Sequence, residues 1–205
     1  MTPRQRVGKR AIDLVLGGLM LVVASPLLLL IPVAIRLSSP GPSLFRQRRV
    51  GQDGRLFTCF KFRTMYVDAP DRWNADGSAV TAGDDPRVTA IGRWLRQSSL
   101  DELPQLINVL KGEMSLVGPR PELPGALDRY SERQRTRLLM PPGITGWAAI
   151  HGRNNVPWNA RLELDLEYVA RFSLRLDLYI LLCTVLIVLR ATGVNDSGRR
   201  GAEVR

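Results

Sequence analysis

The sequence predicts a mostly helical α+β protein with a re-entrant membrane hairpin at its N-terminus. Three features predict this class: a long apolar run near residue 20, a turn between two β-prone runs near residue 52, and amphipathic helical patterns elsewhere. We expect residues 1–37 to form a helix–break–helix membrane hairpin. Residues 38–192 should form a compact cytosolic domain with a small β-hairpin and interfacial amphipathic helices, and residues 193–205 a flexible tail.

The composition limits the partners and the chemistry. Lys and Arg number 29 against 19 Asp and Glu, which gives a net charge of +10. This balance suits a polyanionic partner: nucleic acid, an anionic membrane surface or a phosphorylated substrate. Cys59 and Cys183 lack the spacing of a disulfide framework or a zinc site. The single histidine, His151, argues against a histidine metal site or a Ser-His-Asp triad, although one histidine can still act as a lone base.

The membrane element is predicted by the apolar run from Ala11 to Ile35, which is long enough to cross a bilayer. A secretory signal peptide is the alternative. Signal peptides have a shorter apolar region and a small-residue cleavage site, whereas this run ends in Arg36 without such a site. We therefore expect the segment to be retained.

A break is predicted at Ser25-Pro26, in the middle of the apolar run. Pro26 offers no N–H to the carbonyl of Val22, and the Ser25 hydroxyl can bond a carbonyl freed in this way. Basic residues flank both ends of the run, so the positive-inside rule places both ends in the cytoplasm. A re-entrant hairpin satisfies both observations, and a proline-kinked spanning helix is the alternative.

A β-hairpin is predicted after the SSPGP turn at Ser38–Pro42, with its own turn at Gly51–Gly54. Its second arm presents Lys61 and Arg63 with the same parity, so both can face an anion. A solvated basic face or contact with lipid headgroups is the alternative. Residues 67–92 are rich in turn formers and are expected to form a flexible loop.

A helix that starts at the adjacent acids Asp101 and Glu102 is predicted next. Ser98 or Ser99 can cap it, apolar residues spaced from Leu106 to Leu110 give it a buried face, and Gly112 ends it. Acids in the first turn also stabilise a helix through its dipole, so an ordinary structural role is the alternative for this pair.

In the C-terminal third, the sequence predicts helices and a turn that pack against the rest of the domain. A charged helix should end before Pro141, and Trp147 should anchor a Gly-rich turn. A further helix is expected over Trp158–Phe172, with Leu162, Leu166 and Val169 on one side. The apolar run Leu178–Leu189 would span only about 18 Å as a helix, so it should lie at the membrane interface or pack on the domain; a buried core helix is the alternative.

Long motifs also occur in a fixed order along the chain. They are KRAIDL (Lys9–Leu14), Ser25-Pro26, KFRTM (Lys61–Met65), DPRVTAIGRWLRQSSLDELPQLINVLKGEMSLVGPRP (Asp85–Pro121) and PGITGWAAIHGRNN (Pro142–Asn155). They closely resemble the monotopic phosphoglycosyl transferases, also called the bacterial sugar transferase family. The resemblance covers nearly the whole chain, so we expect the minimal catalytic unit of that family.

The resemblance implies an enzyme that transfers sugar 1-phosphate from a UDP-sugar to polyprenyl (undecaprenyl) phosphate and releases UMP. This step initiates a bacterial polysaccharide or glycoconjugate. It also implies a Mg²⁺ ion and a location in the bacterial inner membrane, with the catalytic domain on the cytoplasmic face. Expected partners are both substrates, membrane lipid and downstream glycosyltransferases; a homodimer is compatible with the sequence.

The same resemblance assigns the site residues. Asp101 takes the place of the nucleophile that forms a covalent phosphosugar intermediate, and it also contacts the metal. Glu102 takes the place of its partner carboxylate. Two adjacent like charges push their pKa values apart, which would leave Glu102 able to exchange a proton with polyprenyl phosphate. Substrate or phosphate contacts are expected of Lys61, Arg63, Arg96, Pro119, Arg120, Pro121 and Arg153.

Two other functions compete with this one. A membrane-tethered nucleic-acid-binding protein would suit the charge, but the basic residues are dispersed and no known nucleic-acid-binding motif appears. A non-catalytic scaffold of a glycan-assembly complex would suit the membrane element, but the intact Asp101-Glu102 pair argues against it. We therefore expect no nucleic acid among the partners.

Overall fold

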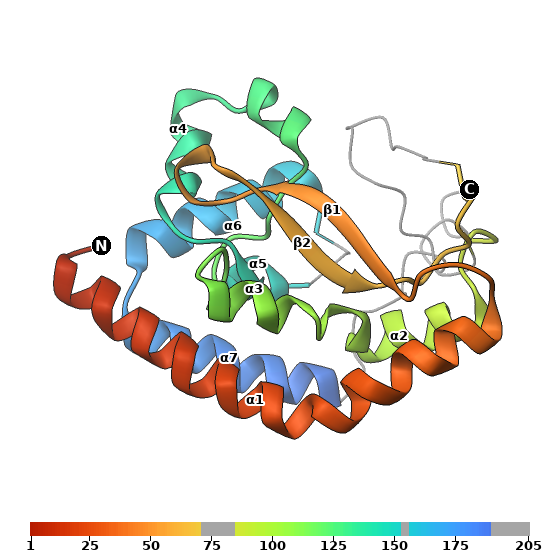
Figure 1. The fold of residues 1–205 in the computed structure, drawn as a ribbon. Helices are drawn as coiled ribbons and strands as arrows, with labels where there is room; N and C mark the ends of the chain where they lie inside the picture. The colour runs from red at the N-terminus through yellow and green to blue at the C-terminus, as the bar shows by residue number, and fades with distance from the viewer. Residues whose placement is uncertain (71–84, 153–155, 190–205) are drawn as a thin grey trace, which may run out of the picture.

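The computed structural model describes residues 1–70, 85–152 and 156–189. The long N-terminal helix α1 (Pro3–Ser38) runs along one edge of the molecule (Figure 1). Helix α7 (Leu174–Leu189) lies beside its first half, and α2 (Ala90–Ser98) lies beside its second half. The short helix α3 (Gln105–Lys111) separates this layer from a β-hairpin. The mostly helical α+β class is therefore confirmed.

Helix α1 is continuous over 36 residues. Thr2 begins it with a capping box, in which Thr2 Oγ1 accepts from Gln5 N–H and the Gln5 side chain accepts from Thr2 N–H. Pro26 lies inside the helix, and Ser25 Oγ donates to Val22 O at 2.7 Å. The serine thus satisfies the carbonyl that the proline leaves without a donor.

The break expected at Ser25-Pro26 takes the form of a bend rather than a separation into two helices, and Figure 1 shows α1 bent near its middle. At about 1.5 Å per residue, 36 residues reach about 54 Å, which exceeds the roughly 30 Å hydrocarbon core of a bilayer. Within the described part, α1 is the helix long and apolar enough to cross a membrane. The structure is compatible with membrane association, and the re-entrant topology stays a prediction.

The β-hairpin is confirmed. Strands β1 (Leu44–Val50) and β2 (Leu56–Phe62) pair antiparallel around the short 3₁₀ turn η1 (Gln52–Gly54). Asp53 and Gly54 occupy the left-handed region there, with φ values of 55° and 77°, which Asp and Gly tolerate better than most residues. Asn108 of α3 fixes β2 against the helix: its side-chain oxygen accepts from Phe60 N–H and its amide donates to Thr58 O.

The acid pair lies in the 3₁₀ turn η2 (Leu100–Glu102), so the expectation that it opens a helix capped by Ser98 or Ser99 is wrong. Ser99 has a φ of 60° and ends α2, while the Ser98 hydroxyl bonds back into that same helix. The next helix, α3, begins after Pro104, since proline has no N–H to give to a helix that starts earlier. Its predicted end at Gly112 is confirmed, with a φ of 82°.

A second, parallel sheet pairs β3 (Ser115–Val117) with β4 (Gly143–Thr145). The backbones approach closely beyond it, because a Cβ on Gly118 would lie 2.2 Å from Pro141 O. The charged helix expected before Pro141 is instead a series of short helices. They are η3 (Pro124–Arg129), α4 (Glu132–Arg135) and η4 (Thr136–Leu139), and α5 (Trp147–Ile150) follows β4.

The last two helices lie close to the positions that the sequence predicted. Helix α6 (Trp158–Arg171) buries Leu162 and Leu166, as predicted, and Val169 packs against the core. Helix α7 buries Ile180 completely but exposes a row of large apolar side chains, so it is not a fully buried core helix. The exposed residues are Leu178, Tyr179, Leu182, Val185, Leu186 and Val188.

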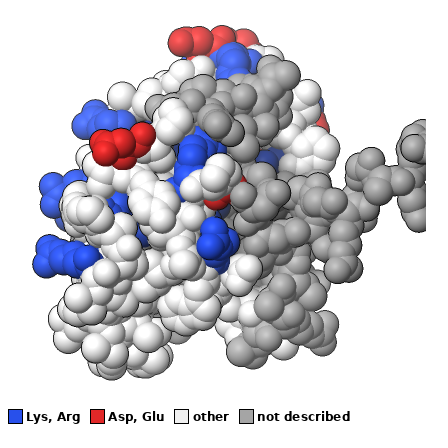
Figure 2. Space-filling view, turned by 90° about the vertical axis from the view of Figure 1, so that its right-hand side faces the viewer, with Lys and Arg blue, Asp and Glu red and all other residues white. Residues whose placement is uncertain are grey.

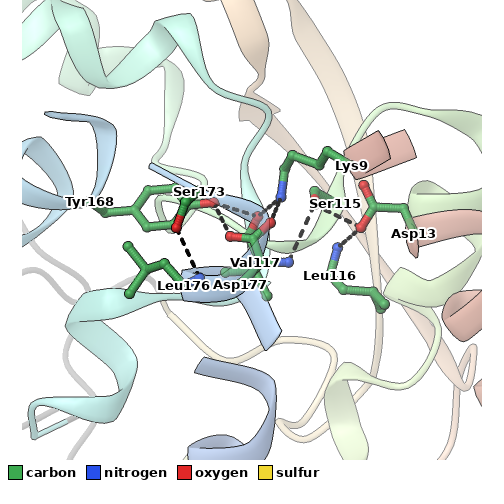
Figure 3. Close-up of polar contacts among 9 residues, drawn as sticks. All are labelled: Lys9, Asp13, Ser115, Leu116, Val117, Tyr168, Ser173, Leu176 and Asp177. Carbon is green, nitrogen blue, oxygen red and sulfur yellow. Dashed lines mark hydrogen bonds and ion pairs between the residues drawn. The ribbon is translucent and has the colours of Figure 1, made fainter. Parts of the chain in front are cut away.

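Buried polar residues of α1 join it to the rest of the protein (Figure 3). Lys9 Nζ donates to Asp177 Oδ2 of α7 at 2.6 Å and to Val117 O at 2.8 Å. Asp13 accepts from Ser115 Oγ and from the Leu116 N–H. We call the five side chains of this network the anchor cluster; they are Lys9, Asp13, Ser115, Tyr168 and Asp177.

Candidate active site

The carboxylates of Asp101 and Glu102 meet basic side chains from two distant parts of the chain. Lys61 Nζ of β2 donates to Glu102 Oε1 at 2.6 Å, and Arg120 Nη2 donates to the same oxygen at 3.3 Å. The Glu102 side chain is 17% exposed, whereas Arg120 is 44% exposed. The geometry therefore joins three of the predicted site residues around Glu102 and leaves the Arg120 guanidinium open to solvent.

The two carboxylates have opposite electrostatic settings. Burial and then repulsion from Glu102 raise the pKa of Asp101 to about 6. Burial alone would raise the pKa of Glu102 as well, but Lys61 and Arg120 outweigh it and lower that pKa to about 2. The pKa values are thus pushed apart, in the sense opposite to our expectation, because both cations contact Glu102. Glu102 is the fixed anion, and Asp101 is the more basic carboxylate.

Asp101 is the less constrained member of the pair. Its side chain is partly buried, and among the described residues burial and neighbouring charges act on its carboxylate without a hydrogen bond to it. Arg96 faces it electrostatically while Arg96 Nε donates to Thr64 Oγ1 at 2.9 Å. A partly buried carboxylate with a raised pKa and an uncommitted oxygen is suited to attack an electrophile or bind a cation.

Pro119 and Pro121 flank Arg120 and fix its backbone through their carbonyls. Pro119 O accepts from Gly143 N–H at 2.9 Å, and Pro121 O accepts from Arg49 Nη1 at 3.0 Å. Arg120 connects these prolines to the acid pair. The described contacts of the prolines themselves are backbone hydrogen bonds that hold the chain in place.

Of the other two predicted residues, Arg63 lies elsewhere and Arg153 is not described. Arg63 is buried, and its guanidinium donates to Ser39 and to the Pro40 carbonyl, so within the described residues it holds the end of α1. Arg63 therefore does not share a face with Lys61 at the acid pair, because the chain has left β2 at Phe62. Arg153 lies outside the described residues.

The sequence did not single out two further arginines near the pair. Arg49 of β1 contacts Pro121 O, and its charge acts on both Arg120 and Glu102. Arg137 of η4 donates to the carbonyl of Arg120 at 2.8 Å. Each belongs to a run of basic residues in the sequence, so no local signal distinguishes it from its neighbours.

Protein side chains supply only some of the ligands that a divalent metal ion would need at this site. Among residues 1–70, 85–152 and 156–189, no three His, Cys, Asp or Glu side chains gather in a way that could hold a metal. Mg²⁺, however, commonly binds one or two carboxylates together with substrate phosphates and waters. Asp101 has an oxygen available for such an ion, whereas Glu102 is occupied by Lys61 and Arg120.

The basic surface is consistent with an anionic ligand. Figure 2 shows several Lys and Arg side chains across one face of the molecule, with few acidic side chains between them. Cationic side chains arranged around a recessed carboxylate attract phosphorylated substrates and balance charge on a transferring phosphoryl group.

Known proteins resemble the chain over most of its length. The profile of the bacterial sugar transferase family matches residues 4–191. The uncharacterized sugar transferase EpsL of Bacillus subtilis is 44% identical over 195 residues, which cover 95% of this chain and 94% of EpsL. The undecaprenyl-phosphate glucose phosphotransferase of Komagataeibacter xylinus is 46% identical over 192 residues, which cover 86% of this chain.

A third relative has a name that specifies a reaction. The UDP-glucose:undecaprenyl-phosphate glucose-1-phosphate transferase of Escherichia coli is 44% identical over 188 residues, which cover 88% of this chain. The chain spans only 35% of the length of the Komagataeibacter protein and 40% of the Escherichia coli protein. The family match over residues 4–191, with these identities, leaves no ambiguity at the family level: the chain belongs to the bacterial sugar transferase family.

Proposed function

We propose that the protein transfers sugar 1-phosphate from a UDP-sugar to undecaprenyl phosphate, with release of UMP. The observation that carries this proposal is the acid pair: a basic, uncommitted Asp101 beside an ion-paired Glu102, with Arg120 exposed above it. The names of the Komagataeibacter and Escherichia coli relatives, a glucose phosphotransferase and a glucose-1-phosphate transferase that use undecaprenyl phosphate, support the same reaction class.

In the first step, an Asp101 oxygen attacks the phosphorus that bears the sugar. The bond between this phosphorus and the bridging oxygen breaks, and UMP leaves with the electron pair. The product is an acyl phosphate, in which the sugar phosphate is joined to the Asp101 carboxylate. The raised pKa of Asp101 supports this role, because a more basic carboxylate is a better nucleophile while remaining ionised at neutral pH.

In the second step, a phosphate oxygen of undecaprenyl phosphate attacks the same phosphorus. The acyl phosphate bond breaks, the Asp101 carboxylate is restored, and undecaprenyl-diphosphate-sugar forms. Both steps pass through a phosphoryl group whose charge needs fixed cations around it. The charges of Lys61, Arg96 and Arg120 all act on Asp101, so these are the cations that can provide them.

Glu102 acts as a fixed anion in this proposal. Its ion pairs with Lys61 and Arg120 hold both cations beside Asp101, and its low pKa leaves it without a proton to exchange. When bound, a Mg²⁺ ion would neutralise charge on the phosphate of the leaving UMP, and Asp101 with the substrate phosphates would hold it.

The membrane arrangement is part of the same proposal. We infer that α1 enters and leaves the cytoplasmic leaflet of the bacterial inner membrane, with the acid pair on the cytoplasmic side. Exposed apolar side chains on α1 and α7, which lie side by side, support a shared membrane-facing surface. Cysteines placed at residues 3 and 43 should be labelled from the same side of sealed vesicles; labelling from opposite sides would mean a spanning helix.

The reaction is tested with protein purified in lipid nanodiscs, Mg²⁺, undecaprenyl phosphate and a panel of radiolabelled UDP-sugars. We expect one or more sugars to yield a lipid-linked product with an equal amount of UMP. Absence of product from every sugar would contradict the proposed reaction, and it would favour a non-catalytic scaffold.

A further inference from the structure

Residues 119–122, which carry Arg120, are held by an unusual run of backbone contacts. Four successive carbonyl oxygens each accept a hydrogen bond, and the donors come from β1, η4 and β4. The four bonds are Gly143 N to Pro119 O at 2.9 Å, Arg137 Nη2 to Arg120 O at 2.8 Å, Arg49 Nη1 to Pro121 O at 3.0 Å, and Val50 N to Glu122 O at 2.9 Å. This segment has no helix or sheet ladder of its own.

The orientation of the Arg120 side chain depends on the position of this backbone segment. Within the described residues its guanidinium makes a single hydrogen bond, to Glu102 at 3.3 Å, and the side chain is 44% exposed. Long exposed side chains are positioned poorly by one surface contact. The fixed backbone must therefore supply most of the orientation, and Pro119 and Pro121 further restrict it.

Arg137 is the buried donor in this set. It is 2% exposed, and its fork reaches three acceptors: the carbonyl of Arg120, the Tyr130 hydroxyl and the Asp165 carboxylate. Asp165, from α6, is 1% exposed. A buried ion pair costs much of its own attraction in desolvation, so a pair of this kind is weak support for a purely stabilising role.

We propose that Arg137 is a positioning residue, which fixes the backbone at Arg120 and thereby holds the Arg120 guanidinium over the acid pair. The inference rests on the proposed function, since it assigns Arg120 to phosphoryl transfer. The competing role is purely structural: Arg137 would simply join η4 to α6. Arg49 is a less suitable residue for the test, because its charge also acts directly on Glu102.

Two variants weaken the contact in different ways. Arg137→Lys keeps the buried positive charge for Asp165 but cannot reach three acceptors with one nitrogen. Arg137→Met combined with Asp165→Leu removes both charges, which avoids an unpaired buried carboxylate. The matched control is Arg133→Gln, since Arg133 pairs with Glu163 of the same helix α6 at the surface, with 69% of its side chain exposed.

The decisive measurement is a double-mutant cycle with Arg120→Ala, in the nanodisc transfer assay with Tm recorded for each protein. We expect Arg137→Lys to lower kcat about tenfold to a hundredfold, as for a displacement of about 1 Å, with a smaller change in KM for the UDP-sugar. In the Arg120→Ala background the same substitution should change kcat by no more than about twofold. Arg133→Gln should change neither kcat nor KM.

Equal losses in both backgrounds would overturn the inference, and so would full activity of Arg120→Ala. A readout that needs no turnover separates this inference from the proposed reaction. In ¹³C NMR of arginine-labelled protein, the guanidinium signal that Arg120→Ala removes should shift or broaden in Arg137→Lys and stay in place in Arg133→Gln, because Arg137 no longer fixes the backbone at Arg120. An unchanged Arg120 signal in Arg137→Lys would overturn the inference even if no sugar proves to be a substrate.

Discussion

The acid-pair site and the anchor cluster both contain charged groups removed from water, but they differ in how completely those charges are paired. In the anchor cluster, Lys9, Asp13 and Asp177 are at most 5% exposed, and each finds hydrogen-bond partners. In the acid-pair site, Glu102 pairs with Lys61 and Arg120, and Asp101 is left with a raised pKa. The anchor cluster thus pairs its buried charges, whereas the site leaves one partly buried carboxylate without an ion pair, an arrangement typical of reactive groups and costly in stability.

The two clusters are linked through short segments. Arg10 of α1 donates to the last carbonyls of α3, the helix that follows the acid pair. Lys9 and Asp13 hold β3, which leads through Gly118 to Arg120. Helix α1 thus contacts the helix that follows the acid pair and the strand that leads to Arg120. We expect substitutions in the site to reduce turnover and leave the fold intact, and substitutions in the anchor cluster to do the reverse.

Asp101→Asn should have the largest effect on activity and little adverse effect on the fold. Removal of the nucleophile should lower turnover by about 10⁴-fold or more. The Tm should stay equal or rise, because burial and Glu102 disfavour a charge at this position. Turnover and Tm are measured with Asp128→Asn, an exposed acid, as control. Activity within tenfold of wild type would remove Asp101 from its role.

Lys9→Met should show the opposite signature. It leaves Asp177 buried without its cation, which costs about 3–5 kcal/mol and should lower the Tm in nanodiscs. The double variant Lys9→Met with Asp177→Leu should recover most of that stability, since neither charge then needs a partner. A double variant no more stable than Lys9→Met would contradict the view that the pair is held together by charge.

The pH dependence should distinguish the two carboxylates of the site. Asp101 attacks only when ionised, so the rate of UMP release without lipid acceptor should fall tenfold per pH unit below about 6. Glu102→Gln removes the repulsion and should move this limb to lower pH. The folded-state pKa is raised, so the stability linked to Asp101 is present below its unfolded pKa and lost as pH rises through about 6. A shift of the pH–rate limb to higher pH in Glu102→Gln would contradict the assignment of this limb to Asp101.

Ser115→Ala should have the smallest effect. It removes one of the two hydrogen bonds to Asp13, and the Leu116 N–H still donates to that carboxylate. We expect a loss of about 1 kcal/mol in the free energy of unfolding, measured by denaturant titration, and an unchanged rate of UMP release. A slower release without loss of stability would mean that the anchor cluster takes part in turnover.

Local patterns in the sequence predicted the elements that short-range physics decides. The turn at Gly51–Gly54 and the helix end at Gly112 were predicted correctly, and the apolar run is helical, although its re-entrant topology stays a prediction. The start of α3 was not, because a capping serine and an acidic first turn look the same whether or not the helix begins there. Pro104 and the left-handed Ser99 decide the matter.

The site was predictable in its residue types but not in its geometry. Family motifs pointed to the acid pair, yet the pairing of Glu102 with Lys61, 41 residues away, depends on the hairpin packing against η2. Lys9 and Asp177 are 168 residues apart and carry no shared local signal. Arg137 belongs to a basic stretch and is distinguished only by its burial.

The most direct test of the central claim is to trap the covalent intermediate. Protein in nanodiscs without undecaprenyl phosphate is incubated with Mg²⁺ and a UDP-sugar, identified by the transfer assay, whose sugar-bearing phosphate is radiolabelled. We predict that wild-type protein retains label with release of an equal amount of UMP, that later addition of undecaprenyl phosphate moves the label to lipid, and that Asp101→Asn retains none. Lipid-linked product without any labelled protein, or label on the Asp101→Asn variant, would contradict Asp101 as the nucleophile.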